Sequence, residues 1–242
     1  MKLLSTARRA IKSRVQHHRL QSQYFEDLRR YNELAAGEQK AHSSHLYPCL
    51  YDATQQTEIE PIYFYQDAWA FEEILRVNPQ THIDIGSSHR LVSFLSKCTE
   101  LTMVDIRPLS LPMTSIKFRE GDILQLPFAD QAIDSLSSIC VIEHIGLGRY
   151  GDALDPNGTE KAAHEIDRVL NVGAHFYFSV PVEKENKTYF NAHRSFNEQY
   201  LLSGLFANYT VQDRKYIYGY EFGENLREEQ FGIGCYHLLK TS

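Results

Sequence analysis

Residues 81–105 read THIDIGSSHRLVSFLSKCTELTMVD, and this stretch decides the fold class. A short apolar run, 82–85, stops at Gly86, and a helix-like segment then leads to a second apolar run that ends in Asp105. The pattern predicts a strand, a tight turn, a helix, a second strand and an acid. In open α/β sheets such a unit places a small-molecule site at the carboxyl ends of the strands, and the acid, about 20 residues past the turn, accepts hydrogen bonds from ribose hydroxyls. We therefore expect a nucleoside-bearing cofactor.

The rest of the chain continues this alternation. Helices are expected from Pro61 onward and over 159–170 and 197–206, and further strands over 116–120, 133–141 and 174–180. Gly173 is expected in the left-handed position that caps a helix. Two late β-rich runs, 209–218 and 231–239, have no long helix between them. We predict an α/β fold for residues 61–242: a Rossmann-like, seven-stranded mixed sheet with helices on both faces and an antiparallel C-terminal hairpin.

Residues 1–60 are predicted to form a separate N-terminal helical extension and connector. The first 20 residues contain six basic side chains and no acid, and an apolar stripe recurs at helical spacing through Leu4, Ala7, Ile11 and Val15. A basic amphipathic helix of this kind contacts an anionic membrane surface or a partner. The other interpretation is a helix that packs on its own domain or on a second copy in a homodimer.

Composition narrows the functional classes. The 242 residues carry a net charge of −6, which argues against a nucleic-acid binder that relies on bulk attraction. The four cysteines are scattered without a CxxC pair, so we expect a reducing, cytoplasmic environment and no metal site. No apolar run reaches the roughly 18 residues of a membrane span, and the N-terminus does not resemble a signal peptide.

The order of elements, with the glycine turn at 84–88, Gly121-Asp122-Ile123 after the third strand and Glu143-His144 after the fourth, resembles the class I S-adenosylmethionine-dependent methyltransferases. The resemblance covers roughly residues 61–240. Within that superfamily the stretch EHIGLGRYGDALDPNGT, together with FNAHR, resembles a poorly characterised branch often associated with surface-glycan genes. The turn departs from the usual pattern at Ser88, where a second glycine is typical.

The resemblance implies S-adenosylmethionine as the cofactor and assigns residues to it. The turn residues hold the methionine end, Asp105 holds the ribose, and the pair after the third strand holds the adenine. Tyr65 belongs to an aromatic segment, 63–67, that can fold over the cofactor as a lid. The predicted cofactor-binding residues are Asp84, Gly86, Ser87, Ser88, Asp105, Ile106, Asp122, Ile123 and Tyr65.

Polar residues after the fourth and fifth strands are predicted to contact the acceptor. His144 and His193 are the candidate catalytic bases, because imidazole can take a proton from a hydroxyl near neutral pH. Arg149 and Arg194 are candidate clamps for a phosphate or carboxylate. The remaining predicted acceptor-binding residues are Glu143, Tyr150 and Asp152.

These patterns predict methyl transfer to a small acceptor, most plausibly a sugar or glycan-precursor hydroxyl. The alternative is a catalytically degenerate relative that serves as a binding or scaffold protein in a surface-glycan pathway, which would account for Ser88. A nicotinamide-dependent oxidoreductase is disfavoured, because GxGxxG is absent and the final hairpin would be unexplained.

Overall fold

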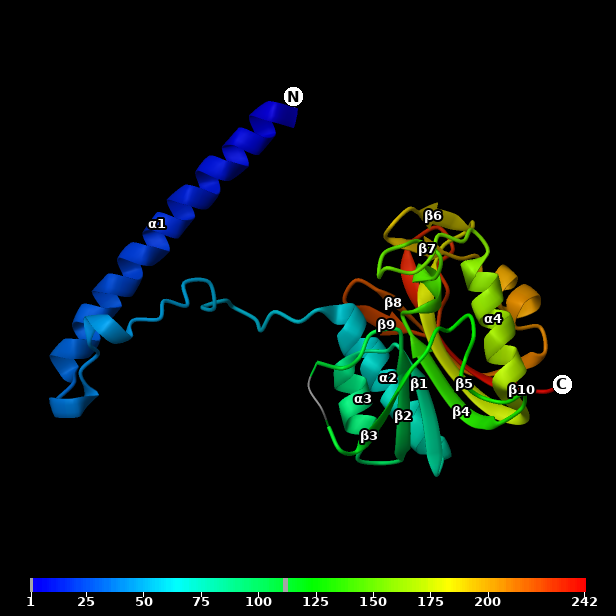
Figure 1. Ribbon diagram of the computed structural model, residues 1–242. Helices are drawn as coiled ribbons and strands as arrows, with labels where there is room; N and C mark the ends of the chain where they lie inside the picture. Colours follow the sequence, from blue (N-terminus) through cyan, green and yellow to red (C-terminus); the bar gives the residue numbers. More distant parts are fainter. Residues whose placement is uncertain (1, 111–112) are drawn as a thin grey trace. The chain divides into compact units, whose positions relative to one another are not determined.

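A computed structural model describes residues 2–110 and 113–242, with side chains described for 12–110 and 113–242. The chain divides into two compact units, Met1–Ile59 and Glu60–Ser242. Figure 1 colours both units along the sequence and labels their helices and strands. The cavity described below belongs to the second unit.

The N-terminal unit is built on one long helix, α1 (Lys2–Leu34), followed by the short 3₁₀ turns η1 (Gly37–Gln39) and η2 (Ser43–His45). Asn32 exchanges two hydrogen bonds with the backbone of Ala41, and His17 Nδ1 lies 2.7 Å from the Tyr51 hydroxyl. These contacts hold the connector against α1. No described helix has the length and apolar character needed to cross a membrane.

The predicted basic and apolar stripes of α1 depend largely on side chains outside the described residues, among them Lys2, Leu4, Ala7, Arg8, Arg9 and Ile11. Val15, the last position of the apolar stripe, is exposed. Contact of this helix with a membrane, a partner or a second copy therefore stays a prediction.

The second unit is organised around an eight-stranded sheet. Five neighbouring strands run parallel, and three C-terminal strands extend the sheet through successive antiparallel pairings. The order across the sheet is β3 (Ile116–Glu120), β2 (Glu100–Asp105), β1 (Thr81–Ile85), β4 (Ile133–Ile139), β5 (Leu170–Val182), β10 (Gly232–Lys240), β8 (Tyr209–Tyr218) and β9 (Glu221–Gly223).

This architecture confirms the predicted mixed α/β sheet with an antiparallel C-terminal end. The seven predicted strands are all present, and the eighth, β9, is a short edge strand paired with β8. Sequence reasoning missed β9 and also a separate two-stranded sheet of β6 (Lys187–Tyr189) and β7 (His193–Ser195). Each of these three strands has only three residues, too short to show an alternation of apolar and polar side chains.

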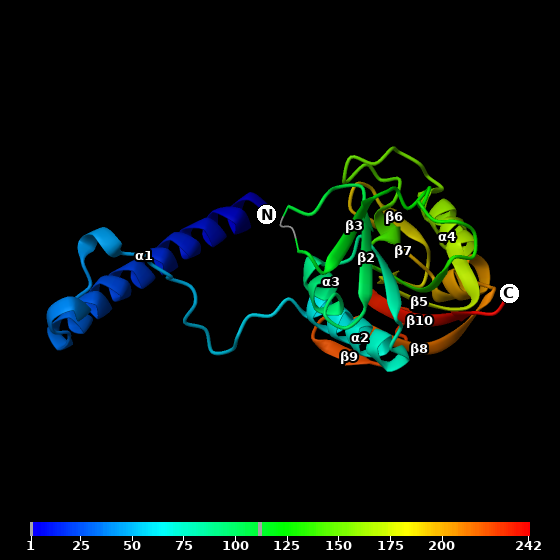
Figure 2. The same ribbon diagram turned by 60° about the horizontal axis from the view of Figure 1, so that its bottom comes forward.

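Helices cover both faces of the sheet (Figures 1 and 2). On one face α2 (Pro61–Val77) and α3 (His89–Leu95) bury Trp69, Ile74 and Leu91 against the strands. On the other face α4 (Gly158–Val169) and a single π-helical turn, η4 (Tyr200–Leu205), pack around Phe176 and Phe178. The α2 helix begins where Glu60 accepts hydrogen bonds from two backbone amides of its first turn, and Pro61 needs no partner there.

The helix predicted over 197–206 is present over residues 198–205, and its part η4 is π-helical. One local prediction needs correction. The helix over 159–170 forms as α4, but Gly173 does not cap it, because α4 ends at Val169 and Leu170 is already extended. Gly173 adopts a positive φ of 86° inside β5, where the register with β4 shifts. The glycine therefore forms an irregularity within the strand, as glycines with positive φ do at bulges.

Candidate active site: a cavity at the carboxyl ends of the parallel strands

A cavity opens where β1, β2 and β4 end. Because parallel strands point the same way, the loops after them meet at one edge of the sheet. One wall, the cofactor wall, is formed by the loops after β1, β2 and β3 and includes Gly86, Asp105 and Ile123. The opposite wall, the β4 wall, is formed by residues 140–153. Tyr63 of α2 also lines the cavity.

The turn after β1 is held by a buried carboxylate. Asp84 is fully buried, and its two oxygens accept from the Ser87 amide (3.1 Å) and the Ser137 hydroxyl (2.5 Å). Burial raises the pKa of Asp84 to about 6. Gly86 at the turn has φ of 64°, and its amide donates to the carbonyl of Val104. Asp84 thus shapes the turn from beneath, while Gly86, Ser87 and Ser88 line the cavity.

The structure explains the serine that departs from the usual glycine pattern. Ser88 has φ of −61°, a conformation open to any residue. Its hydroxyl donates to Asp67 (2.5 Å) and accepts from the Leu91 amide as the N-terminal cap of α3. A hydrogen bond from this hydroxyl to a ligand would therefore have to compete with both of these contacts. Nothing in the backbone at Ser88 requires glycine.

Asp105 lies at the carboxyl end of β2, beside the glycine turn. One carboxylate oxygen accepts from the Arg107 amide at 2.8 Å, and the side chain is 15% exposed. The other oxygen, Oδ2, lies 3.8 Å from the position that a Cβ on Gly86 would occupy, so it faces the glycine turn. Ile106 follows it on the cavity wall. The carboxylate is turned toward the cavity rather than into bulk water.

The loop after β3 supplies the remainder of the cofactor wall. Asp122 and Ile123 both line the cavity, and Ile123 is 4% exposed. One oxygen of Asp122 accepts from the Leu124 amide at 2.9 Å, which fixes the turn. An apolar side chain beside a carboxylate suits a flat heterocycle with an exocyclic amine.

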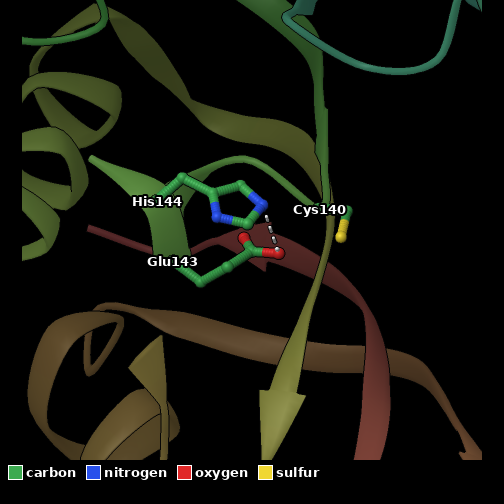
Figure 3. A group of neighbouring side chains, drawn as sticks. All are labelled: Cys140, Glu143 and His144. Carbon is green, nitrogen blue, oxygen red and sulfur yellow. Dashed lines mark ion pairs between the residues drawn. The ribbon is translucent and has the colours of Figure 1, made fainter. Parts of the chain in front are cut away.

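The loop after β4 contains a cluster of ionisable groups (Figure 3). Cys140 has a positive φ of 59°, and the 3₁₀ turn η3 (Ile142–His144) follows it. His144 Nδ1 lies 2.6 Å from the carbonyl oxygen of Ala192, and His144 Nε2 lies 3.6 Å from Glu143 Oε1. Burial raises the pKa of Glu143 to about 7 and lowers that of His144 to about 4. Cys140 and His144 line the cavity.

The loop that continues this wall is folded around Asp152. Its carboxylate accepts from the backbone amides of Gly146, Gly148 and Tyr150. A Cβ on Gly146 would lie 2.1 Å from the carbonyl oxygen of Asp155, and φ at this glycine is 81°. Both facts require glycine at this position. Asp152 lines the cavity, but its oxygens are engaged in holding the loop.

Two arginines stack on Tyr150, which lines the cavity. The guanidinium of Arg107 lies 4.6 Å from the ring centroid and that of Arg149 lies 5.2 Å from it. Arg149 also donates to the Ala192 carbonyl at 3.0 Å. Tyr150 and Arg107 line the cavity, whereas Arg149 contacts the Tyr150 ring without lining the cavity. Sequence reasoning missed Arg107, although it follows Asp105 by two residues at a strand end.

Besides Asp84, Glu143 and Arg149, three more predicted site residues do not line the cavity. Arg194 is buried and donates to the carbonyl oxygens of Ile145, Asp155 and Pro156 and to the Thr159 hydroxyl, so its guanidinium braces the loop from beneath. His193 lies in β7 against Tyr189 and Phe231.

Tyr65 is the third of these residues. Its hydroxyl donates to the Tyr220 carbonyl, and its ring stacks on Phe222. Tyr63, two residues earlier in the same aromatic segment, lines the cavity instead. Helical geometry explains the difference, because residues two apart in a helix point in different directions.

Comparison with known proteins identifies the fold. A family described as "Caenorhabditis protein of unknown function, DUF268" matches residues 114–214, and no curated protein matches the chain. A putative sarcosine dimethylglycine methyltransferase from Galdieria sulphuraria superposes with a TM-score of 0.56 at 14% identity, covering 77% of this chain and 89% of the other.

Two further structures have the same fold. The Burkholderia thailandensis 1,6-didemethyltoxoflavin-N1-methyltransferase, solved with S-adenosylhomocysteine, gives a TM-score of 0.53 at 15% identity and covers 76% and 80% of the two chains. The [4+2]-cyclase SpnF also gives 0.53, at 14% identity, and covers 72% and 81%. The chain therefore has the class I methyltransferase fold, and the cyclase shows that this fold also carries other reactions.

Proposed function

We propose that this protein binds S-adenosylmethionine in the cavity and transfers its methyl group to a small acceptor. The observation that carries the proposal is the cofactor wall, where the Gly86 turn, the Asp105 carboxylate and the buried Ile123 border one space. These three features suit the methionine end, the ribose diol and the adenine of one ligand. The toxoflavin enzyme of the same fold was solved with S-adenosylhomocysteine, which supports this choice of ligand.

The main task of the protein in this reaction is to hold the acceptor and the methyl group in the right position. The acceptor oxygen attacks the methyl carbon in line with the carbon–sulfur bond, the electron pair of that bond goes to sulfur, and the products are S-adenosylhomocysteine and a methyl ether. A hydroxyl acceptor must also lose its proton. Proximity and alignment supply most of the rate, since a sulfonium is already a good leaving group.

The acceptor belongs at the end of the cavity bordered by Tyr63, His144 and Tyr150. We propose a sugar or glycan-precursor hydroxyl. Aromatic side chains can pack against the apolar face of a sugar ring, and the Arg107–Tyr150–Arg149 stack brings positive charge to this end, where a phosphate or carboxylate on the acceptor would be stabilised. Because both guanidinium groups are positively charged, we expect an acidic acceptor to bind better than a neutral one.

Calorimetry with S-adenosylmethionine, S-adenosylhomocysteine and NAD tests the proposal on the intact chain. We expect binding of both adenosyl ligands and none of NAD. Turnover is then followed as S-adenosylhomocysteine release in the presence of sugars and sugar phosphates. Adenosyl binding without turnover on any acceptor class would favour the non-catalytic alternative, and failure of both adenosyl ligands to bind would overturn the proposal.

A further inference from the structure

The β4 wall contains a buried carboxylate without a partner. Glu143 is 0% exposed, and neither of its oxygens has a hydrogen-bond partner among the described residues. Buried carboxylates in native proteins are almost always paired with donors or bound to a cation, because desolvation of the charge is costly. The nearby Cys140 thiol and Arg149 favour its charged form but leave both oxygens without a hydrogen bond in the described part of the chain, so a further partner would stabilise this carboxylate.

Two neighbours of Glu143 have the chemistry of metal ligands. The Cys140 sulfur, one Glu143 oxygen and one His144 nitrogen all lie within 4.8 Å of one another. Figure 3 shows the imidazole and the carboxylate side by side, with the thiol nearby at the end of β4. The spacing Cys-x-x-Glu-His places all three on one strand end and the single turn that follows it.

The tautomer of His144 is set for ligation. Nδ1 lies 2.6 Å from the Ala192 carbonyl oxygen, which can only accept, so Nδ1 must donate and Nε2 must carry the lone pair. That lone pair is on the nitrogen nearest Glu143. Metal-bound histidines usually donate their other ring nitrogen to a carbonyl or carboxylate in this way.

The backbone at Cys140 adds a further indication. Its φ of 59° is uncommon for a residue with a side chain and costs free energy unless the surroundings enforce it. Such strain gathers at functional sites, where it directs a side chain that a regular strand would point elsewhere. Here the conformation falls on the residue that supplies the sulfur.

We propose that Cys140, Glu143 and His144 bind a divalent cation, most suitably zinc, with a fourth position open to the cavity. One thiolate, one carboxylate and one neutral imidazole match the mixed sulfur, oxygen and nitrogen ligands of zinc, and their two negative charges balance the cation. The 3.6 Å between His144 Nε2 and Glu143 Oε1 is close to the roughly 3.4 Å that separates two ligands of a tetrahedral zinc with bonds near 2 Å. Cys140 and His144 line the cavity, so the open position faces it.

A direct interaction between Glu143 and His144 is the competing explanation of the cluster. A distance of 3.6 Å is too long for a hydrogen bond between these two groups. It would also leave the second carboxylate oxygen without a partner. A cation satisfies the carboxylate, the imidazole and the thiol together.

The role of the cation rests on the proposed methyl transfer, although its binding does not. A hydroxyl that reaches the open position would bind the cation through oxygen, which lowers the pKa of that hydroxyl and prepares the alkoxide for attack on the methyl group. The acceptor is then a hydroxyl that ligates zinc, and the proton leaves to water rather than to His144. The predicted base His144 becomes a metal ligand.

Cobalt(II) is the probe, because it replaces zinc and reports its ligands by absorption. The full chain is stripped with a chelator and titrated with Co²⁺, and then with Zn²⁺ as competitor. We expect saturation at one equivalent, a thiolate-to-cobalt charge-transfer band, the visible bands of tetrahedral cobalt, and loss of all of them on addition of zinc. Absence of the charge-transfer band in the wild-type chain would overturn the proposal.

Variants locate the site. Cys140→Ser is expected to abolish the charge-transfer band, and Glu143→Gln to weaken cobalt affinity at least roughly tenfold, since even outer partners of metal ligands contribute that much. The matched controls Cys98→Ser and Glu185→Gln change exposed residues and should leave the titration unchanged. A band that survives in Cys140→Ser but disappears in Cys98→Ser would place the metal elsewhere and overturn the proposal.

The same preparations separate the two proposals. Circular dichroism confirms that each variant is folded, and S-adenosylhomocysteine binding is measured on the stripped and the zinc-loaded chain. Cobalt binding at Cys140 without any adenosyl binding would support the metal site and contradict the methyltransferase proposal. Adenosyl binding by a folded chain that takes up no cobalt would contradict the metal site alone.

Discussion

The two walls of the cavity differ in whether their carboxyl groups have hydrogen-bond partners. On the cofactor wall the carboxylates of Asp84, Asp105 and Asp122 each accept hydrogen bonds from nearby backbone amides. On the β4 wall Glu143 is more deeply buried than Asp105 or Asp122, and within the part of the chain that the structure describes it has no hydrogen-bond partner. A wall whose polar groups are already paired is a shaped surface for a ligand. A wall with a buried, unpaired carboxyl group is suited to a ligand or cation that pairs with that group.

The largest effect is expected at Arg194, whose guanidinium supports the loop of the β4 wall. Arg194→Met removes a buried cation that donates to four acceptors in and beside the loop and is expected to lower the free energy of unfolding by about 3 kcal/mol or more. Arg149→Met, a matched change at an exposed arginine, should cost much less. Urea denaturation followed by circular dichroism gives both values. Equal losses would contradict the assignment of Arg194 to the support of the loop.

The cofactor wall rests on a chain of buried side chains whose pH response is predictable. His82 is fully buried between the hydroxyls of Ser135 and Ser137, and Ser137 donates to Asp84. Burial lowers the pKa of His82 to about 3, whereas the unfolded chain takes up this proton near pH 6.5. The folded state therefore loses stability relative to the unfolded state as the pH falls below 6.5.

A difference measurement isolates this contribution, because the raised pKa of Asp84 acts in the opposite direction. Relative to wild type, His82→Asn should gain about 1.4 kcal/mol in free energy of unfolding for each pH unit between 6.5 and 4. Urea denaturation at a series of pH values supplies the comparison. A difference that does not change with pH would show that His82 is protonated in the folded state.

Asp105 tests the cofactor wall itself. Asp105→Ala should weaken S-adenosylhomocysteine binding by roughly tenfold or more, because a partly buried acceptor pair for the ribose is lost. Calorimetry measures the change, and Asp52→Ala, at an exposed residue of the other unit, is the control. An unchanged dissociation constant would remove the ribose contact from the assignment.

The smallest expected effect belongs to Ser88. Ser88→Gly restores the usual turn pattern but removes the cap of α3 and the hydrogen bond to Asp67. The free energy of unfolding should fall by about 1 kcal/mol, while adenosyl affinity stays the same. A clear gain in affinity would mean that the serine does obstruct the ligand.

The sequence predicted the parallel sheet and the strand-end positions of Gly86, Asp105 and Asp122 because strand, turn and helix leave local, periodic patterns. It did not separate Arg149 from Arg194, or Tyr63 from Tyr65. Arg149 lies in a loop and Arg194 in the short strand β7, and both contact residues from distant parts of the chain. The two tyrosines differ only in the direction that helix α2 gives them. The short strands β6, β7 and β9 left too few residues to form a pattern.

The order of the strands and the residue types at their ends were present in the sequence itself, because local propensity and hydrophobic alternation act over a few residues. Whether each of these side chains has a hydrogen-bond partner was decided by the tertiary structure. Ser88 and Arg194 found partners in remote segments, Asp152 found its partners within its own loop, and Glu143 found none among the described residues. A hydrogen-bond partner brought from elsewhere in the chain has no signature in the residues next to it, so the paired and unpaired carboxylates look alike until the chain is folded.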